Sequence, residues 1–167
     1  TLLTLEKTTI VSLLLGKIYR FTNPDECITL HQDILQKDIS TKQRITCYQQ
    51  IGDCQYELER NTESINTYKS LVTIAESHIQ SSSEYKLKTL AETHSKLVKI
   101  YTMMDKSHPI IDHATKAIWY YDYLKELDCD FDVLVLIKLY LTLAKETMKH
   151  KKWQWYSHYS AYESYKS

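Results

Sequence analysis

The residues best able to carry chemistry in this chain are seven histidines and four cysteines. His108 and His113 lie five positions apart, and His150 and His158 lie eight apart. Neither spacing matches the ligand pairs of a helical zinc site, so the sequence predicts no metal site. Lone histidines of this kind are more often surface or packing residues.

The cysteines do not predict a disulfide framework. Cys47 and Cys54 lie on one predicted helix, about 10 Å apart at ~1.5 Å per residue, which is too far to bridge. They are interpreted as small buried apolar residues. Nothing in the sequence pairs Cys27, on the second predicted helix, with Cys129, in a predicted loop. This pattern predicts a reducing, intracellular location, cytoplasmic or nuclear.

Other catalytic patterns are absent from the sequence. Two isolated glycines cannot form a glycine-rich phosphate loop. No stretch resembles a nucleophile elbow, a paired-carboxylate site or a cysteine-protease signature. We therefore expect a protein that is not an enzyme and has no cofactor and no small-molecule substrate.

Charge gives little attraction to polyanions. The chain holds 21 basic and 21 acidic residues, so the sequence predicts no general attraction to nucleic acid or to an anionic membrane. The C-terminal stretch is the exception, because Lys149-His150-Lys151-Lys152 precedes Trp153, Trp155, Tyr156, Tyr159, Tyr162 and Tyr165. Basic residues beside aromatics can bind single-stranded nucleic acid. Aromatic spacings of three and four favour instead a helix that packs or caps, with a protein contact as the second interpretation.

The elements that must position any site are helices. Cys47, Ile51, Cys54 and Leu58 share one helical face, and after a polar break at 60–62 a second apolar face begins at Ile65. Asn61 is expected to cap that second helix. The mid-helix Gly52 costs about 1 kcal/mol relative to Ala, which suggests that a neighbouring helix approaches closely there.

Eight helices are predicted along the chain. They begin near Leu2, Asn23-Pro24, Ser40, Asn61, Ser81-Ser82-Ser83-Glu84, Ser107-His108-Pro109, Asp130 and Lys152. Asn23 is expected to cap the second helix, and Ser40 with Gln43 has the spacing of a capping box at the third. The seventh is apolar nearly all round and is expected to be packed on several sides, the alternative being that one face docks a partner or a missing part of the protein. Its apolar run, Val133 to Ala144, is interrupted by Lys138 and is too short to span a bilayer. With no linker visible, residues 1–167 are interpreted as one domain, a fragment of a longer protein.

The spacing of Tyr48, Ile51-Gly52, Ser64, Tyr68 and Leu71 resembles the tetratricopeptide repeat. Leu15-Gly16 and Tyr19 repeat its core 36 residues earlier, and a degenerate third copy runs through His94, Leu97-Val98 and Tyr101. Gln55 stands where the family has a tyrosine, and the closing proline is absent. The resemblance assigns repeat packing to Gly16, Tyr19, Tyr48, Ile51, Gly52, Ser64, Tyr68, Leu97, Tyr101 and Ala114.

The resemblance implies an all-α, right-handed superhelix of about four antiparallel helical hairpins. The longer units are also similar to the helical repeats of vesicle-fusion attachment (SNAP) proteins and to those that precede PCI domains. Family geometry implies a concave partner-binding face formed by Lys17, Arg20, Gln49, Asp53, Tyr56, Glu57, Ser95, Lys99 and Thr102. The alternative is that these residues form an ordinary solvated face. Asp53 would repel a terminal carboxylate, which argues against binding of chaperone tails.

The function expected from this fold is a non-catalytic scaffold for protein–protein interaction. It would bind a peptide or helix of a partner protein, assemble a multi-subunit complex, or do both. Two alternatives remain open: a nucleic-acid-associated helical domain and a regulatory domain of a larger enzyme. The sequence does not identify the partner, the pathway, the repeat subfamily or the oligomeric state.

Overall fold

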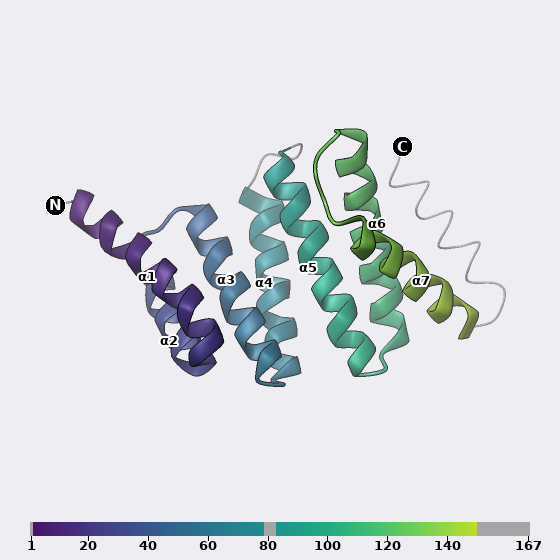
Figure 1. Cartoon of the computed structure of the whole chain (residues 1–167), viewed down its shortest axis with the longest axis horizontal. Coiled ribbons are helices and arrows are strands. Elements are labelled where there is room, and N and C mark those ends of the chain that lie inside the picture. Colours follow the sequence, from purple (N-terminus) through teal and green to yellow (C-terminus); the bar gives the residue numbers. More distant parts are fainter. Residues whose placement is uncertain (1, 79–82, 150–167) are drawn as a thin grey trace. The chain divides into compact units, whose positions relative to one another are not determined.

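The computed structural model describes residues 2–78 and 83–149, and within these ranges the chain is all-α (Figure 1). It forms seven helices, and no strand occurs among the residues described. The all-α prediction is therefore confirmed. The eighth helix, predicted from Lys152, and the aromatic stretch that begins at Trp153 lie outside the described residues.

Two compact units make up the chain, Thr1–His78 and Ile79–Ser167. The first contains α1 (Leu2–Thr22), α2 (Pro24–Leu35), α3 (Thr41–Glu57) and α4 (Asn61–His78). The second contains α5 (Glu84–Met103), α6 (Ser107–Glu126) and α7 (Val133–Lys149). Inside each unit every helix packs against the next, and α1 also contacts α3. A single domain over residues 1–167 stays a prediction, since two such units can belong to one domain or to two.

Two helices begin with the capping chemistry predicted for them, and a third is capped by the last serine of the run predicted to open it. The side chain of Asn23 accepts a hydrogen bond from the Glu26 amide, ahead of Pro24 at the start of α2. Ser40 and Gln43 form a capping box at the start of α3. The Ser83 hydroxyl accepts from the Lys86 amide at the start of α5. Each bond satisfies a backbone donor that the first helical turn leaves unpaired.

Asn61 does not cap α4 as predicted. It is the first residue of that helix, and its buried Oδ1 accepts no hydrogen bond. The carbonyl of Arg60 accepts the first helical bond instead, from the Ser64 amide. The N-cap position of α4 is therefore Arg60, one residue earlier than the predicted cap, Asn61.

That turn is one of three closed helix ends of the same kind. After α3, the Glu59 amide donates to Tyr56 O and the Arg60 amide donates to Gln55 O, which is the Schellman pattern. Equivalent bonds close α5 and α6. The left-handed position is taken by Glu59, Asp105 and Asp128, with φ of 58°, 49° and 54°. Glycine is the usual residue there, so each acidic residue carries some backbone strain.

The two glycines lie inside helices, where they allow close contact between paired helices. A Cβ at Gly16 would collide with Cε1 of His31, on α2. A Cβ at Gly52 would lie 2.8 Å from Cε1 of Tyr68, on α4. Both rings are buried, and the Ser64 hydroxyl donates to Gly52 O at 2.8 Å. Gly16 and Gly52 thus occupy matching places in two successive helical pairs.

The core of the first unit gathers around Cys27, Ile28, Ile51 and Cys54, with the partly buried Tyr19, Leu35 and Leu58 packed against them. Among the other residues assigned to repeat packing, Tyr48 is half-buried. The rest are buried, namely Ser64, Tyr68, Leu97, Tyr101 and Ala114.

The helix α7 is less buried than its sequence predicts. Leu136 and Leu139 are buried, and α6 is the neighbour against which α7 packs in the second unit. Val133, Leu134, Ile137 and Leu141, on the other side, are between 49% and 65% exposed. The expectation of packing on several sides is therefore wrong for the part of the chain that the structure describes.

Of the helices in residues 2–78 and 83–149, none combines the length and the apolar character that crossing a bilayer requires.

Adding a methyl group at either glycine is expected to destabilise the fold. Gly16→Ala should lower the free energy of unfolding by about 1–3 kcal/mol, because overpacking against His31 outweighs the ~1 kcal/mol gain in helix propensity. Gly52→Ala should act in the same direction through Tyr68. Urea unfolding followed by circular dichroism measures both changes.

Ser70→Ala provides the matched control, because Ser70 is exposed on α4 and should change stability by less than about 0.5 kcal/mol. A Gly16→Ala protein as stable as Ser70→Ala would show that the two helices do not need this close approach.

Candidate partner-binding surfaces

The residues predicted to form one concave face fall into both units. Lys17 and Arg20 lie on α1, and Gln49, Asp53, Tyr56 and Glu57 lie on α3, which contacts α1. Ser95, Lys99 and Thr102 lie on α5, in the second unit. The six residues of α1 and α3 lie on two helices that contact each other in the first unit. The three residues of α5 belong to the second unit.

Arg20 is the centre of the interactions between α1 and α3. Its Nη1 donates to Asp53 Oδ2 at 2.6 Å. Its Nε and Nη2 both donate to Glu57 Oε1, at 3.0 and 2.9 Å. Burial lowers the pKa of Arg20, but the two carboxylates more than offset this effect, so the pKa is raised overall. The guanidinium is thus held as a cation between two helices.

Asp53 is a packing residue and not part of an open face. It is 6% exposed, and besides Arg20 it accepts a hydrogen bond from the Tyr68 hydroxyl on α4. Burial, reinforced by Asp53, raises the pKa of Tyr68, so the hydroxyl remains a donor at neutral pH. This corrects the expectation that Asp53 would meet a ligand and repel its carboxylate, because the charge is already neutralised by Arg20 inside the unit.

The remaining members of the set differ in how available they are. Lys17, Glu57 and Lys99 are exposed, whereas Gln49 and Tyr56 are half-buried. The hydroxyl of Ser95 donates to Ala91 O and that of Thr102 to Val98 O, each at 2.7 Å along α5. The two hydroxyls thus bond to their own helix, which leaves Lys17 and Lys99 as the exposed cations of the predicted face.

A histidine pair that sequence reasoning missed joins α5 to α6. The Nδ1 atoms of His94 and His113 are 2.9 Å apart, so one ring donates a hydrogen bond to the other. His94 stacks on Tyr120, and His113 stacks on Tyr101. The two histidines are 19 positions apart, and the available signal was that His94 takes the place of Tyr48 in the degenerate third repeat copy.

The surroundings of His94 favour the neutral form of its ring. Burial, with His113 next and Lys116 third, lowers the pKa of His94 to about 3, and Asp112 opposes them. Within residues 2–78 and 83–149, no group of three or more His, Cys, Asp or Glu side chains could hold a metal ion. The contact between the two rings joins α5 to α6.

The most exposed apolar surface of the first unit lies on α1, and we call it the α1 stripe. Its side chains occur at intervals that place them on one helical face. They are between 40% and 82% exposed, and the stripe comprises Val11, Leu14, Leu15, Ile18 and Phe21. The opposite face carries Gly16 and Arg20, which pack toward α2 and α3. Sequence reasoning missed this stripe.

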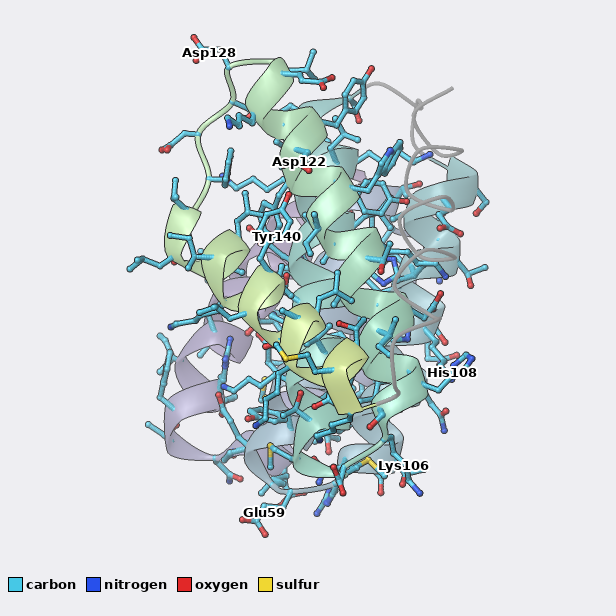
Figure 2. The ribbon with its side chains drawn as sticks, turned by 90° about the vertical axis from the view of Figure 1, so that its right-hand side faces the viewer. Glu59, Lys106, His108, Asp122, Asp128 and Tyr140 are labelled. Atoms are coloured by element: carbon cyan, nitrogen blue, oxygen red, sulfur yellow. The ribbon has the colours of Figure 1, made fainter. Side chains whose placement is uncertain are left out.

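The helix α7 exposes apolar residues and buries a carboxylate. Glu146 is 2% exposed, where it accepts from the Ser107 hydroxyl at 2.7 Å and pairs with Lys149 at 2.9 Å. These two partners outweigh burial and keep the pKa of Glu146 below its ordinary value. Tyr140 reaches the adjacent α6, where its hydroxyl donates to Asp122 Oδ2 at 3.0 Å (Figure 2). Polar bonds thus fasten α7 to α6 while Leu134 and Leu141 stay exposed.

Comparison with known proteins does not assign the chain to a family. No family model, no curated protein and no solved structure matches the sequence or the fold.

The buried Asp53 should matter more to stability than its neighbour Glu57. Asp53→Asn should lower the free energy of unfolding by about 1–3 kcal/mol, because Arg20 and the Tyr68 hydroxyl lose their charged partner in a buried site. Glu57→Gln, at a side chain that is 35% exposed, should cost less than about 1 kcal/mol. Urea unfolding of both variants measures which of them loses more free energy of unfolding. Equal losses would contradict the assignment of Asp53 to packing.

Acidification should weaken the second unit through His94. Its pKa is depressed in the folded chain, so below pH 6.5 the unfolded chain binds a proton that the folded chain does not. The stabilising effect is full above about pH 6.5 and declines toward pH 3. Between pH 7 and pH 5 the loss should reach at most about 2 kcal/mol for one proton.

The measurement is urea unfolding of wild type and His94→Gln at both pH values. The variant should lose less stability on acidification than wild type does. His108→Gln, at an exposed histidine on the same unit, is the control and should retain the wild-type pH dependence. An unchanged pH dependence in His94→Gln would contradict a buried neutral histidine.

Proposed function

We propose that the chain is a non-catalytic module for protein–protein interaction whose helical pairs form a right-handed superhelix similar to tetratricopeptide repeats. Its partner segment would be an amphipathic helix of another protein. The observation that carries this proposal is the α1 stripe, five large apolar side chains exposed on one face of one helix. Contiguous apolar surface of this kind commonly marks an interaction site.

Repeated local structure supports the superhelical part of the proposal. The glycine contacts Gly16–His31 and Gly52–Tyr68 join the two helices of successive pairs at matching places. The left-handed residues Glu59 and Asp105 each follow the repeat position of Gly52 or Val98 by seven residues. The first helices of neighbouring pairs, α1 and α3, also contact each other. A stacked array of similar hairpins requires contacts of these kinds.

The chemistry of the α1 stripe favours a helix as the occupant. Positions 11, 14, 15, 18 and 21 follow the spacing at which one helix packs along another. Ten residues of helix extend about 15 Å, which fits three turns of a partner helix with apolar residues at i, i+3, i+4 and i+7. A scaffold with this recognition mode needs no catalytic group and no cofactor.

Two charges introduced on the α1 stripe should abolish partner binding without unfolding the chain. We expect Leu14→Glu/Ile18→Glu to lose at least about ten-fold in the recovery of the proteins that the wild type retains, because burying two carboxylates costs more than 1.4 kcal/mol. The measurement is quantitative affinity capture from lysate in 0.5 M NaCl. Circular dichroism first verifies that the variant is folded.

The matched control is Ser70→Glu/Thr73→Glu, which adds the same two charges to exposed polar positions of α4 and should bind as wild type does. Equal recovery by both double variants would contradict a partner site on the α1 stripe. Recovery of nucleic acid alone, lost at 0.5 M NaCl, would favour the nucleic-acid alternative. A concentration-dependent dimer in light scattering, absent from the stripe variant, would show that the occupant is a second copy of the chain.

A further inference from the structure

Two cysteines that are far apart in the sequence meet in the core of the first unit. Cys27 on α2 and Cys54 on α3 are both fully buried and belong to one packed cluster with Ile28 and Ile51. The helices α2 and α3 pack against each other, and this shared cluster brings the two thiols into one neighbourhood of the core. A disulfide requires Cα atoms about 4.4–6.8 Å apart, a separation that facing positions on two packed helices can provide. Both cysteines are reduced in this structure.

A third residue makes the two thiols chemically unequal. His31 Nδ1 lies 2.8 Å from Cys27 O and 3.5 Å from Cys27 Sγ. Because a carbonyl oxygen can only accept, Nδ1 carries the hydrogen, which also faces the Cys27 sulfur. The hydrogen bond from Cys54 lowers the pKa of Cys27, burial opposes it, and His31 assists it. The same contact, together with burial, raises the pKa of Cys54.

We propose that Cys27 and Cys54 are a redox site that forms a reversible disulfide between α2 and α3 when it reacts with a small-molecule disulfide such as oxidised glutathione. Cys27 is the attacking thiol and Cys54 the resolving thiol. The proposal is independent of the partner-binding function, because it depends only on contacts inside the first unit.

The reaction is an ordinary thiol–disulfide exchange in two steps. Cys27 loses its proton, and its sulfur attacks one sulfur of the small disulfide, whose S–S bond breaks as a mixed disulfide forms and one thiolate leaves. Cys54 then loses its proton, and its sulfur attacks Cys27 Sγ and expels the second thiolate. The two departing thiolates take up the two protons. Two protein thiols are thus oxidised by two electrons, and one small disulfide is reduced to two thiols.

Access to the buried sulfurs requires local opening, and α2 is suited to it. At 12 residues, α2 is the shortest helix among those described. It buries four residues, against seven in α3, and elements with few buried contacts open at a low free energy. Oxidation should therefore be slow in the folded chain and faster when α2 is loosened. Once formed, the bond closes a loop between positions 27 and 54 and restricts further opening.

The remaining cysteines serve as matched controls. Cys47 is buried on the same helix as Cys54, two turns away, and burial raises its pKa to about 12. Cys129 is partly exposed, in the second unit. A native-state reaction governed by the pairing of Cys27 and Cys54 should leave Cys47 reduced, whereas a reaction governed by exposure should select Cys129.

The test is equilibration of the full, reduced chain with defined ratios of oxidised and reduced glutathione, followed by an acid quench, thiol alkylation and peptide mass mapping. We expect one intramolecular link, between Cys27 and Cys54, with a mass loss of about 2 Da, reversed by dithiothreitol. The melting temperature of the oxidised chain should rise by about 5–10 °C while its helical circular dichroism signal is retained.

Three results would overturn the proposal. They are a link that involves Cys47, modification of Cys129 alone, and four free thiols at the most oxidising ratio. A Cys27–Cys54 link accompanied by loss of helical signal would also overturn it, because the bond would then form only in the unfolded chain. Cys27→Ala should abolish the link and Cys47→Ala should retain it. The wild-type peptide map decides the question even if Cys27→Ala does not fold.

Discussion

The first unit depends on how the side chain of Tyr68 is held. Its ring lies against Gly52, where any larger residue would collide with it, and its hydroxyl donates to Asp53 on the same helix as the glycine. Asp53 in turn pairs with Arg20, on α1. One aromatic residue therefore couples the packing of α4 on α3 to the charge pairing of α3 with α1. Since a buried carboxylate without partners is costly, these residues stabilise one another as a group.

Local chemistry explains which parts of the fold could be predicted. The caps at Asn23, Ser40 and Ser83 depend on contacts within four residues, so the sequence carried enough information to place those helix starts. Asn61 failed as a cap because the preceding turn, with Glu59 in the left-handed conformation, brings the Arg60 carbonyl into the capping position. Turn geometry of this kind has no strong signal when the usual glycine is missing.

Contacts between helices explain what could not be predicted. Helical periodicity predicts that Asp53, a polar residue, is exposed. The ion pair with Arg20 and the hydrogen bond from Tyr68 offset the free-energy cost of burying its carboxylate, and neither can be predicted from the pattern of α3 alone. The pairs Cys27–Cys54 and His94–His113 depend on the register between neighbouring helices, which no pattern along a single helix records. For α7, the pattern showed that the helix is apolar but not which side a neighbour covers, so its burial was overestimated.

Contact between successive helices also has a consequence for how the chain reaches its structure. In the first unit, α1 contacts α2 and α3, and the later contacts join helices that are consecutive along the sequence. Few distant segments must meet before stabilising contacts form, which corresponds to a low contact order and rapid folding. A helical pair such as α3 and α4 can therefore act as a nucleus to which α2 and then α1 are added. Such a chain can begin to fold while it is still being synthesised, as soon as one pair of helices has left the ribosome.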